Sequence, residues 1–167
     1  MRHFLRRHQP SACRRRALKA GLGALVGLAA VALLGEWAGL PLLIAPFGAT
    51  CVLLFSVPES PLSQPANVIG GHLLAASVSV AADALLPPGP ASMALTVGLV
   101  ITLMAMARLT HPPAGADPLV ILPGHFGFEF VLAPILVGSV ALVLIATMVH
   151  RLPPRTAYPM RMPPNRI

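Results

Sequence analysis

Apolar residues fill four stretches of the chain that are each long enough to cross a membrane as a helix. The stretches are residues 17–34, 66–86, 91–109 and 130–150, and charged side chains are almost absent between them. The hydrocarbon core of a bilayer is about 30 Å thick, and about 20 apolar residues in a helix cross it. The pattern therefore predicts an all-α integral membrane protein whose single transmembrane domain covers residues 17–150.

Two shorter apolar runs, residues 42–57 and 113–122, contain residues that break helices. Pro46 and Gly48 interrupt the first run, and a Pro–Pro pair opens the second. Proline lacks a backbone donor and clashes with the preceding helical turn, so neither run is expected to be a plain spanning helix. Irregular backbone persists in lipid only where protein buries it or water reaches it. We expect four full transmembrane helices and two short discontinuous or re-entrant segments packed among them.

The two short runs also resemble each other. A Pro-x-Gly-Ala motif recurs 67 positions later; its residues are Pro46, Gly48 and Ala49, then Pro113, Gly115 and Ala116. The long stretches on either side match at the same spacing. This pattern favours two repeats of helix, broken segment and helix. The alternative is chance, because the motif is short and the chain is rich in these residues.

Basic residues gather at the two ends of the chain. Seven of the twelve Lys and Arg lie in the first nineteen positions, and four follow the last apolar stretch. Such clusters mark the cytoplasmic ends of membrane spans. We therefore expect basic cytoplasmic tails at residues 1–16 and 151–167, with the domain in a bacterial inner membrane. An even number of crossings follows, which either four spans or six crossings as 3+3 inverted repeats satisfy.

Composition excludes several other classes of protein. The formal net charge of +7 does not indicate a nucleic-acid partner, because the charge flanks the spans and one Tyr and one Trp offer little base stacking. Two cysteines indicate neither a disulfide framework nor a metal cluster. No nucleophile elbow, phosphate-binding loop or dinucleotide fingerprint is present. We expect no enzymatic activity, no cofactor and no bound metal; the expected partners are the lipid bilayer and a small solute.

The richest group of reactive side chains follows the third long stretch. Arg108, Thr110, His111 and Asp117 place a cation, a hydroxyl, an imidazole and a carboxylate within ten positions. A short helix starting near Pro113 would direct its free N–H groups toward this segment. The small residues at Gly115 and Ala116 would let another backbone approach. The pattern predicts a pocket of anion size, with Arg108 attracting the anion and His111 donating to it.

The first broken segment and the loop after it supply the corresponding polar residues. Thr50, Gln64 and Asn67 are the candidates for binding the solute from this half. Asn67 is equally well placed to cap the second long helix. Gly70 and Gly71 are expected to allow close helix packing. The residues expected to shape the breaks are Pro46, Gly48, Ala49, Gly70, Gly71, Pro112, Pro113 and Gly115.

Three further side chains are candidates for a proton relay. His72 lies about one turn inside the second long stretch, His125 follows the second broken run, and Glu129 begins the last stretch. Ionisable residues within a membrane are functional or paired. A hydrogen-bonding role in the structure is as well supported for His72. The histidine spacing does not match a metal site.

These motifs together resemble one known family. The run His111-Pro112-Pro113-Ala-Gly-Ala is the motif that names the HPP family of small bacterial and plastid membrane proteins. The resemblance also includes Pro46-x-Gly48-Ala49, residues 61–72, residues 122–127 and the last span. It implies an integral membrane protein with four transmembrane helices, and a link to nitrite transport. Ala66 departs from the basic residue that many members carry, which puts the identity of the anion in doubt.

We therefore expect a membrane transporter or channel for a small inorganic anion, nitrite by the resemblance. The alternative is a non-transporting structural or assembly protein in which the His-Pro-Pro run is a folding element. A bundle of this length is thin for enclosing a pathway, so we also expect a homo-oligomer.

Overall fold

The computed structural model describes residues 5–7, 11 and 13–160, and every element in these ranges is helical. The remaining parts of the predicted tails, 1–16 and 151–167, lie outside the described residues. The elements are α1 (Arg14–Ala38), α2 (Ala45–Ser56), η1 (Pro61–Ser63), α3 (Pro65–Leu85), α4 (Pro90–Met106), η2 (Pro112–Ala116), α5 (Asp117–Gly124), α6 (Phe128–Phe130), η3 (Val131–Val137) and α7 (Gly138–Arg151).

Three helices of the described chain are long and apolar enough to cross a membrane. They are α1, α3 and the continuous helix Phe128–Arg151 formed by α6, η3 and α7. Three of the four predicted spans are thereby confirmed. The fourth, α4, has 17 residues, so it rises about 25 Å, which is less than the hydrocarbon core.

Helix α4 stops short of the predicted Leu109 because its C-terminus closes in a Schellman turn. Arg108 adopts a left-handed conformation with φ of 58°, and the Leu109 N–H donates to the Met104 carbonyl at 2.9 Å. This pattern of bonds satisfies the last carbonyls of a helix and turns the chain away from its axis. The turn directs residues 109–111 back toward α3.

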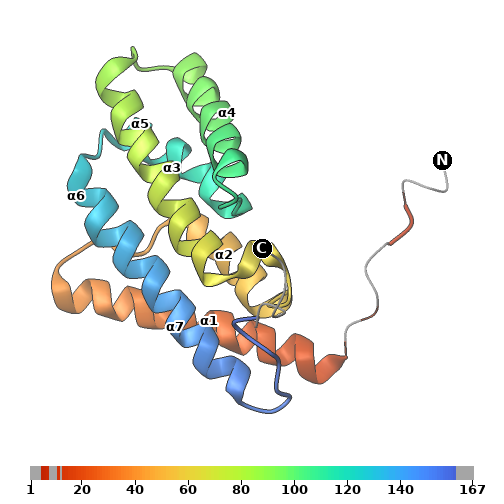
Figure 1. The fold of residues 1–167 in the computed structure, drawn as a ribbon. Helices are drawn as coiled ribbons and strands as arrows, with labels where there is room; N and C mark the ends of the chain where they lie inside the picture. Colours follow the sequence, from red (N-terminus) through yellow and green to blue (C-terminus); the bar gives the residue numbers. More distant parts are fainter. Residues whose placement is uncertain (1–4, 8–10, 12, 161–167) are drawn as a thin grey trace.

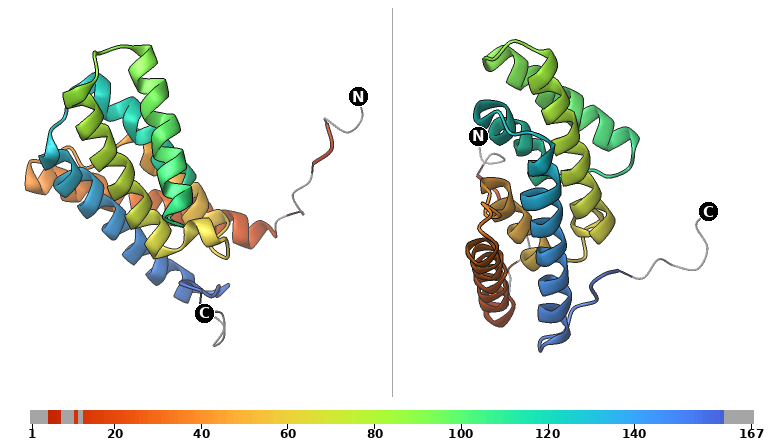
Figure 2. Two further views of the ribbon diagram at one scale, coloured as in Figure 1. Left: turned by 45° about the horizontal axis from the view of Figure 1, so that its top comes forward. Right: turned by 90° about the vertical axis from the view of Figure 1, so that its left-hand side faces the viewer.

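Helix α3 lies at the centre of the protein (Figures 1 and 2). Helices α4 and α5 pack against it on one side, and the η3–α7 helix packs on the other. Helix α1 lies at the far end from α4, where it contacts α2 and α7 (Figure 1). The main apolar core lies between α1, α2 and α7; Phe47, Leu54 and Leu142 are among its fully buried side chains.

Helix α1 packs through a face of small residues. Gly23, Gly27, Val31 and Gly35 are its buried positions, at a spacing of four residues. A Cβ added at Gly23 would lie 2.6 Å from the Phe55 ring. Without a hydrophobic force between helices in lipid, small residues stabilise packing by allowing close approach. The other faces of α1 carry exposed leucines, as a lipid-facing helix requires.

Neither short run is a spanning helix, as predicted, but the expected break within the first run is wrong, because Pro46 lies in the first turn of a continuous helix, where proline is tolerated. The first forms the 12-residue helix α2, which carries Pro46 in its first turn. The second forms the 3-10 helix η2, which begins at Pro112, and then the eight-residue α5, so the expected helix start near Pro113 is confirmed. Each is too short to cross a membrane at 1.5 Å per residue. The two segments contact each other through α2 and η2.

The start of α1 and the end of α7 lie together. The Lys19 ammonium donates to the carbonyls of Leu152 and Pro154, both at 2.7 Å. An even number of crossings requires the two basic ends to be on one side, and the described parts of both ends meet this requirement. The side of the membrane that they face stays a prediction.

Candidate functional site

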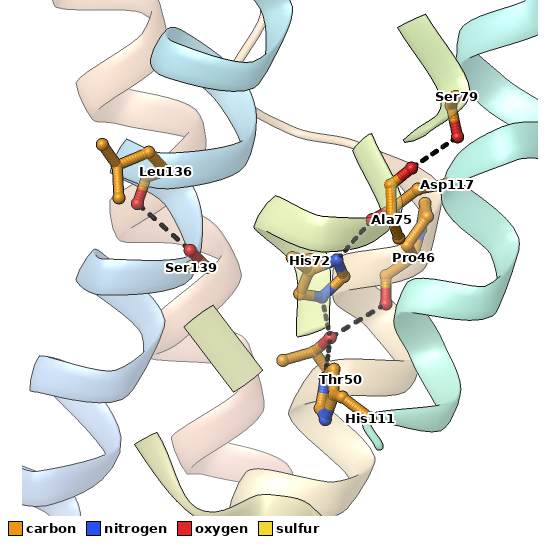
Figure 3. Close-up of polar contacts among 9 residues, drawn as sticks. All are labelled: Pro46, Thr50, His72, Ala75, Ser79, His111, Asp117, Leu136 and Ser139. Carbon is orange, nitrogen blue, oxygen red and sulfur yellow. Dashed lines mark hydrogen bonds and ion pairs between the residues drawn. The ribbon is translucent and has the colours of Figure 1, made fainter. Parts of the chain in front are cut away.

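Four polar side chains meet beside the central helix, where α2 and the η2 segment come together (Figure 3). Thr50 comes from α2, His72 from α3, His111 from the residue before η2, and Asp117 from the start of α5. All four have 0% relative exposure. We call these four residues the buried polar cluster.

The buried polar cluster forms one continuous chain of hydrogen-bond contacts. Asp117 Oδ2 lies 2.8 Å from His72 Nδ1, and His72 Nε2 lies 2.9 Å from Thr50 Oγ1. Thr50 Oγ1 lies 3.0 Å from His111 Nε2, and His111 Nδ1 lies 2.9 Å from the Leu62 carbonyl oxygen. This chain of contacts therefore links α5, α3, α2, the η2 segment and η1.

Aromatic and imidazole rings enclose this chain of contacts. The Phe47 ring meets His72 edge-on with centroids 5.3 Å apart, and the two imidazoles lie 5.0 Å apart. One polar atom of the cluster, Asp117 Oδ1, is buried without a hydrogen-bond partner. Leaving a buried carboxylate oxygen unpaired costs free energy.

Gly71 brings the His111 segment against α3. A Cβ at Gly71 would lie 2.8 Å from His111 Cβ and 2.9 Å from the Leu109 carbonyl oxygen. The expectation of close packing at Gly70 and Gly71 is confirmed, since a Cβ at Gly70 would lie 3.0 Å from the Leu109 side chain. The expectation for Gly115 is wrong, because a Cβ there would meet nothing within 4 Å. The glycine that allows the close approach is Gly71 of α3 and not Gly115 of η2.

The predicted anion-binding residues separate into two groups. Thr50, His111 and Asp117 lie in the buried polar cluster, whereas the Arg108 side chain is exposed and Thr110 is half-buried. Asn67 does not cap α3; the N-cap residue is Gln64, and Asn67 Nδ2 donates to the Thr110 carbonyl at 3.0 Å. Asn67 therefore holds the segment that leads into His111.

Gln64 bonds only to backbone. Its Nε2 donates to the carbonyls of Pro58 and Ser60, both at 2.9 Å, and its Oε1 accepts from the Met160 N–H at 2.9 Å. The side chain thus ties the α2–η1 loop to the C-terminal segment. We expect Gln64→Ala to lower the free energy of unfolding by about 1.5 kcal/mol, because three hydrogen bonds are lost and each, being part-buried or exposed, is worth about 0.5 kcal/mol, the low end of the net value. Thermal unfolding in detergent measures this, with the exposed Thr102→Ala as the control. An unchanged midpoint would contradict it.

The other two relay candidates lie away from the buried polar cluster. His125 Nδ1 contacts Asp83 at 3.0 Å, and the two side chains are 63% and 20% exposed. Asp83 is about 16 Å further along α3 than His72, given eleven residues at 1.5 Å each. Glu129 accepts from the Gly127 N–H at 3.1 Å, so it closes the turn ahead of α6. Of the three candidates, only His72 belongs to the cluster.

The sequence reasoning missed the Leu62 carbonyl and the Phe47 ring. A backbone acceptor carries no signature in the sequence, and a phenylalanine in an apolar run does not differ from core. The pairing of His72 with Asp117, 45 positions apart, was also not foreseen.

The buried polar cluster can bind and pass protons, because the nitrogen and oxygen atoms that form its contacts can each donate or accept a hydrogen bond. Thr50 separates the two imidazoles, and within the described ranges no group of three or more His, Cys, Asp or Glu is placed to hold a metal ion. The hydroxyl and imidazole N–H groups are also the kind of donor that a small oxyanion requires.

A hollow of about 740 Å³ opens on the side where the two basic ends meet. Arg16, Lys19, Glu59 and His150 line it, together with Phe55 and Ser56 at the end of α2. Because Thr50 is six residues before Ser56, the hollow lies about 9 Å along α2 from the buried polar cluster.

Comparisons with known proteins identify a transmembrane family and two transmembrane relatives. Residues 9–159 match the protein family described as "HPP, transmembrane region". Two proteins of Dictyostelium discoideum, both described as transmembrane proteins, are similar. One is 39% identical over 131 residues, covering 74% of this chain and 46% of the relative; the other is 33% identical over 126 residues, covering 71% and 40%. The chain thus spans less than half the length of these relatives. No solved structure matches it.

Proposed function

The chain belongs to the HPP transmembrane family, and on this premise we propose that it moves a small inorganic anion across the membrane. Nitrite is the anion that the resemblance of its motifs to this family favours. The observation that carries the proposal is the buried polar cluster at the meeting of two short segments that do not span, α2 and η2–α5. Ionisable side chains are expensive to place at membrane depth and are found there at solute and ion pathways. Broken helices that meet near the midplane are the binding sites of many secondary transporters.

The hollow between the basic ends supports an entry site for the anion. Arg16 and Lys19 bring positive charge to its wall, against the single carboxylate of Glu59. A cleft lined by one sign of charge raises the local concentration of the opposite ion. An anion would collect there first and then reach Thr50 and His111 when α2 and the η2 segment move apart. The described conformation, with the cluster fully buried, is the closed one in this proposal.

The test is nitrite uptake by liposomes that contain the purified full chain, compared with protein-free liposomes. The site variant is His111→Ala, and His125→Ala removes an exposed histidine as the matched control. A hydrogen bond to a charged group is worth about 1.5–3 kcal/mol, so His111→Ala should reduce uptake by roughly tenfold or more. Size-exclusion chromatography and thermal unfolding establish that each variant is folded.

Two outcomes would contradict the proposal. If the wild-type chain takes up no more nitrite than protein-free liposomes, nitrite transport is rejected. If folded His111→Ala takes up nitrite at the wild-type rate, His111 is not part of the pathway. A second candidate function, a structural or assembly protein, is favoured by the complete burial of the cluster. In that case His111→Ala should lose monodispersity while the wild-type chain shows no uptake.

A further inference from the structure

The buried polar cluster requires one more proton than its groups ordinarily carry. Its four contacts measure 2.8–3.0 Å, so one hydrogen lies in each. The chain of contacts ends at both sides in an oxygen that accepts a hydrogen bond: the Asp117 carboxylate at one end and the Leu62 carbonyl at the other. An ionised carboxylate, two neutral imidazoles and one hydroxyl supply three hydrogens between them. Four contacts with three hydrogens leave one contact as two facing lone pairs.

The hydrogen bonds at the Leu62 end can be assigned by elimination. Because the Leu62 carbonyl cannot donate, His111 Nδ1 carries a hydrogen. The Thr50 hydroxyl has one hydrogen and three acceptors within reach. The Pro46 carbonyl is the most distant, at 3.3 Å, so the hydrogen goes to His72 Nε2 at 2.9 Å or to His111 Nε2 at 3.0 Å. In the first case His72 donates to Thr50 and the fourth proton lies between His72 and Asp117. In the second case the fourth proton makes His111 a cation.

Charge decides between the two cases. The second places a His111 cation and an Asp117 anion at opposite ends of the chain of contacts, with His72 and Thr50 between them. The first leaves His72 and Asp117 as an adjacent pair with no net charge. At low dielectric the attraction between opposite charges falls with distance, so the adjacent pair is the more stable. The titratable groups that contact His72 are Asp117, from α5, and His111, from the η2 side; α2 contributes Thr50 and Phe47.

We propose that the buried polar cluster is a binding site for one exchangeable proton, shared by His72 Nδ1 and Asp117 Oδ2. The hydrogen bonds from His72 to Thr50, from Thr50 to His111 and from His111 to Leu62 then all point toward Leu62. Release of this proton leaves a net charge of −1 and breaks one contact that Thr50 makes. The proton therefore controls whether α2 is bonded to both α3 and the η2 segment.

A coupling to transport follows, and this part rests on the proposed function. A cluster with a charge of −1 repels an anion, whereas the neutral cluster does not. The anion therefore binds beside the protonated cluster, and one proton crosses with it. The proton enters from the bulk phase on one side and leaves to the bulk phase on the other, so no further reactant is needed.

Asp117→Asn is the informative variant because it removes the exchangeable proton and keeps the hydrogen bonds. The amide N–H of Asn can donate to His72 Nδ1, so His72 Nε2–H donates to Thr50 and every later contact is unchanged. Asp83→Asn is the matched control, since it alters the exposed His125–Asp83 pair in the same way.

The first arm measures protonation directly, by ¹⁵N NMR of histidine in the full chain in lipid nanodiscs. We expect a hydrogen on His72 Nε2 and on His111 Nδ1 at neutral pH in the wild type and in Asp83→Asn. Raising the pH should move the His72 hydrogen to Nδ1 in these two proteins, and Asp117→Asn should keep it on Nε2. A His72 that carries hydrogen only on Nδ1 at neutral pH, or a His111 with both nitrogens protonated, would overturn the proposal.

The second arm follows the pH inside liposomes after nitrite is added outside, with protein-free liposomes as the baseline for nitrous acid crossing the lipid. Wild type and Asp83→Asn should acidify the lumen with one proton for each nitrite, and Asp117→Asn should lose this acidification. Nitrite uptake without acidification by the wild type would overturn the coupling. An absence of nitrite uptake in every protein rejects the proposed function, while the NMR arm still decides whether the proton site exists.

Discussion

His72→Ala should destabilise the folded chain by about 3–5 kcal/mol, the cost of removing one partner from a buried charged pair. His72 bonds to Asp117 and Thr50, and it is fully buried. Its loss leaves the Asp117 side chain without its hydrogen-bond partner and the Thr50 hydroxyl without one of two imidazoles. The measurement is the free energy of unfolding in detergent, with thermal midpoint as the second readout.

The exposed pair provides the control for this prediction. His125→Ala breaks the same kind of contact where the side chains are 63% and 20% exposed, so it should cost about 0–1 kcal/mol. A second variant separates charge burial from packing. His72→Ala combined with Asp117→Leu removes both polar groups, and replacing a buried pair by apolar side chains is often neutral or stabilising, so stability should recover in part. If His72→Ala and His125→Ala lower the free energy of unfolding by the same amount, burial does not determine how much the His72–Asp117 pair contributes to stability.

Gly71→Ala should cost about 1–3 kcal/mol, the usual cost of overpacking. The added methyl would lie 2.9 Å from a backbone oxygen and 2.8 Å from His111 Cβ, and backbone cannot rotate away as a side chain can. The His111 segment must shift, which also lengthens the contact between His111 and Thr50. Thermal unfolding measures the loss of stability, and the histidine NMR signals report the shift.

Gly98→Ala is the matched control for this second prediction. Gly98 lies within α4 and has nothing within 4 Å of an added Cβ. In open space a helical Gly→Ala change gains up to about 1 kcal/mol, because alanine has the higher helix propensity. The two variants should therefore move the midpoint in opposite directions. A loss at Gly98 equal to that at Gly71 would contradict the assignment of the effect to the His111 segment.

Several features of the site could be predicted because they depend on local chemistry. A proline near the start of each short run marks where its helix begins, and a histidine and an aspartate inside apolar sequence indicate a buried polar site. The exclusion of Arg108 from that site could not be read from its proximity to His111. The left-handed turn at Arg108 reverses the chain, so residues three apart face different surroundings.

Hydropathy, proline and charge along the sequence are enough to predict that this chain lies in a membrane, where three of its long helices run, that two short runs do not span, and which ends carry the positive charge. These properties follow from hydropathy, proline and charge, each of which acts within a few residues of its position. The packing of the helices brings Thr50, His72, His111 and Asp117 into one cluster and presses the His111 segment against Gly71, and neither contact can be read from the sequence. The physical reason is that such contacts depend on how whole helices pack, and a side chain 45 positions away has no effect on the local pattern.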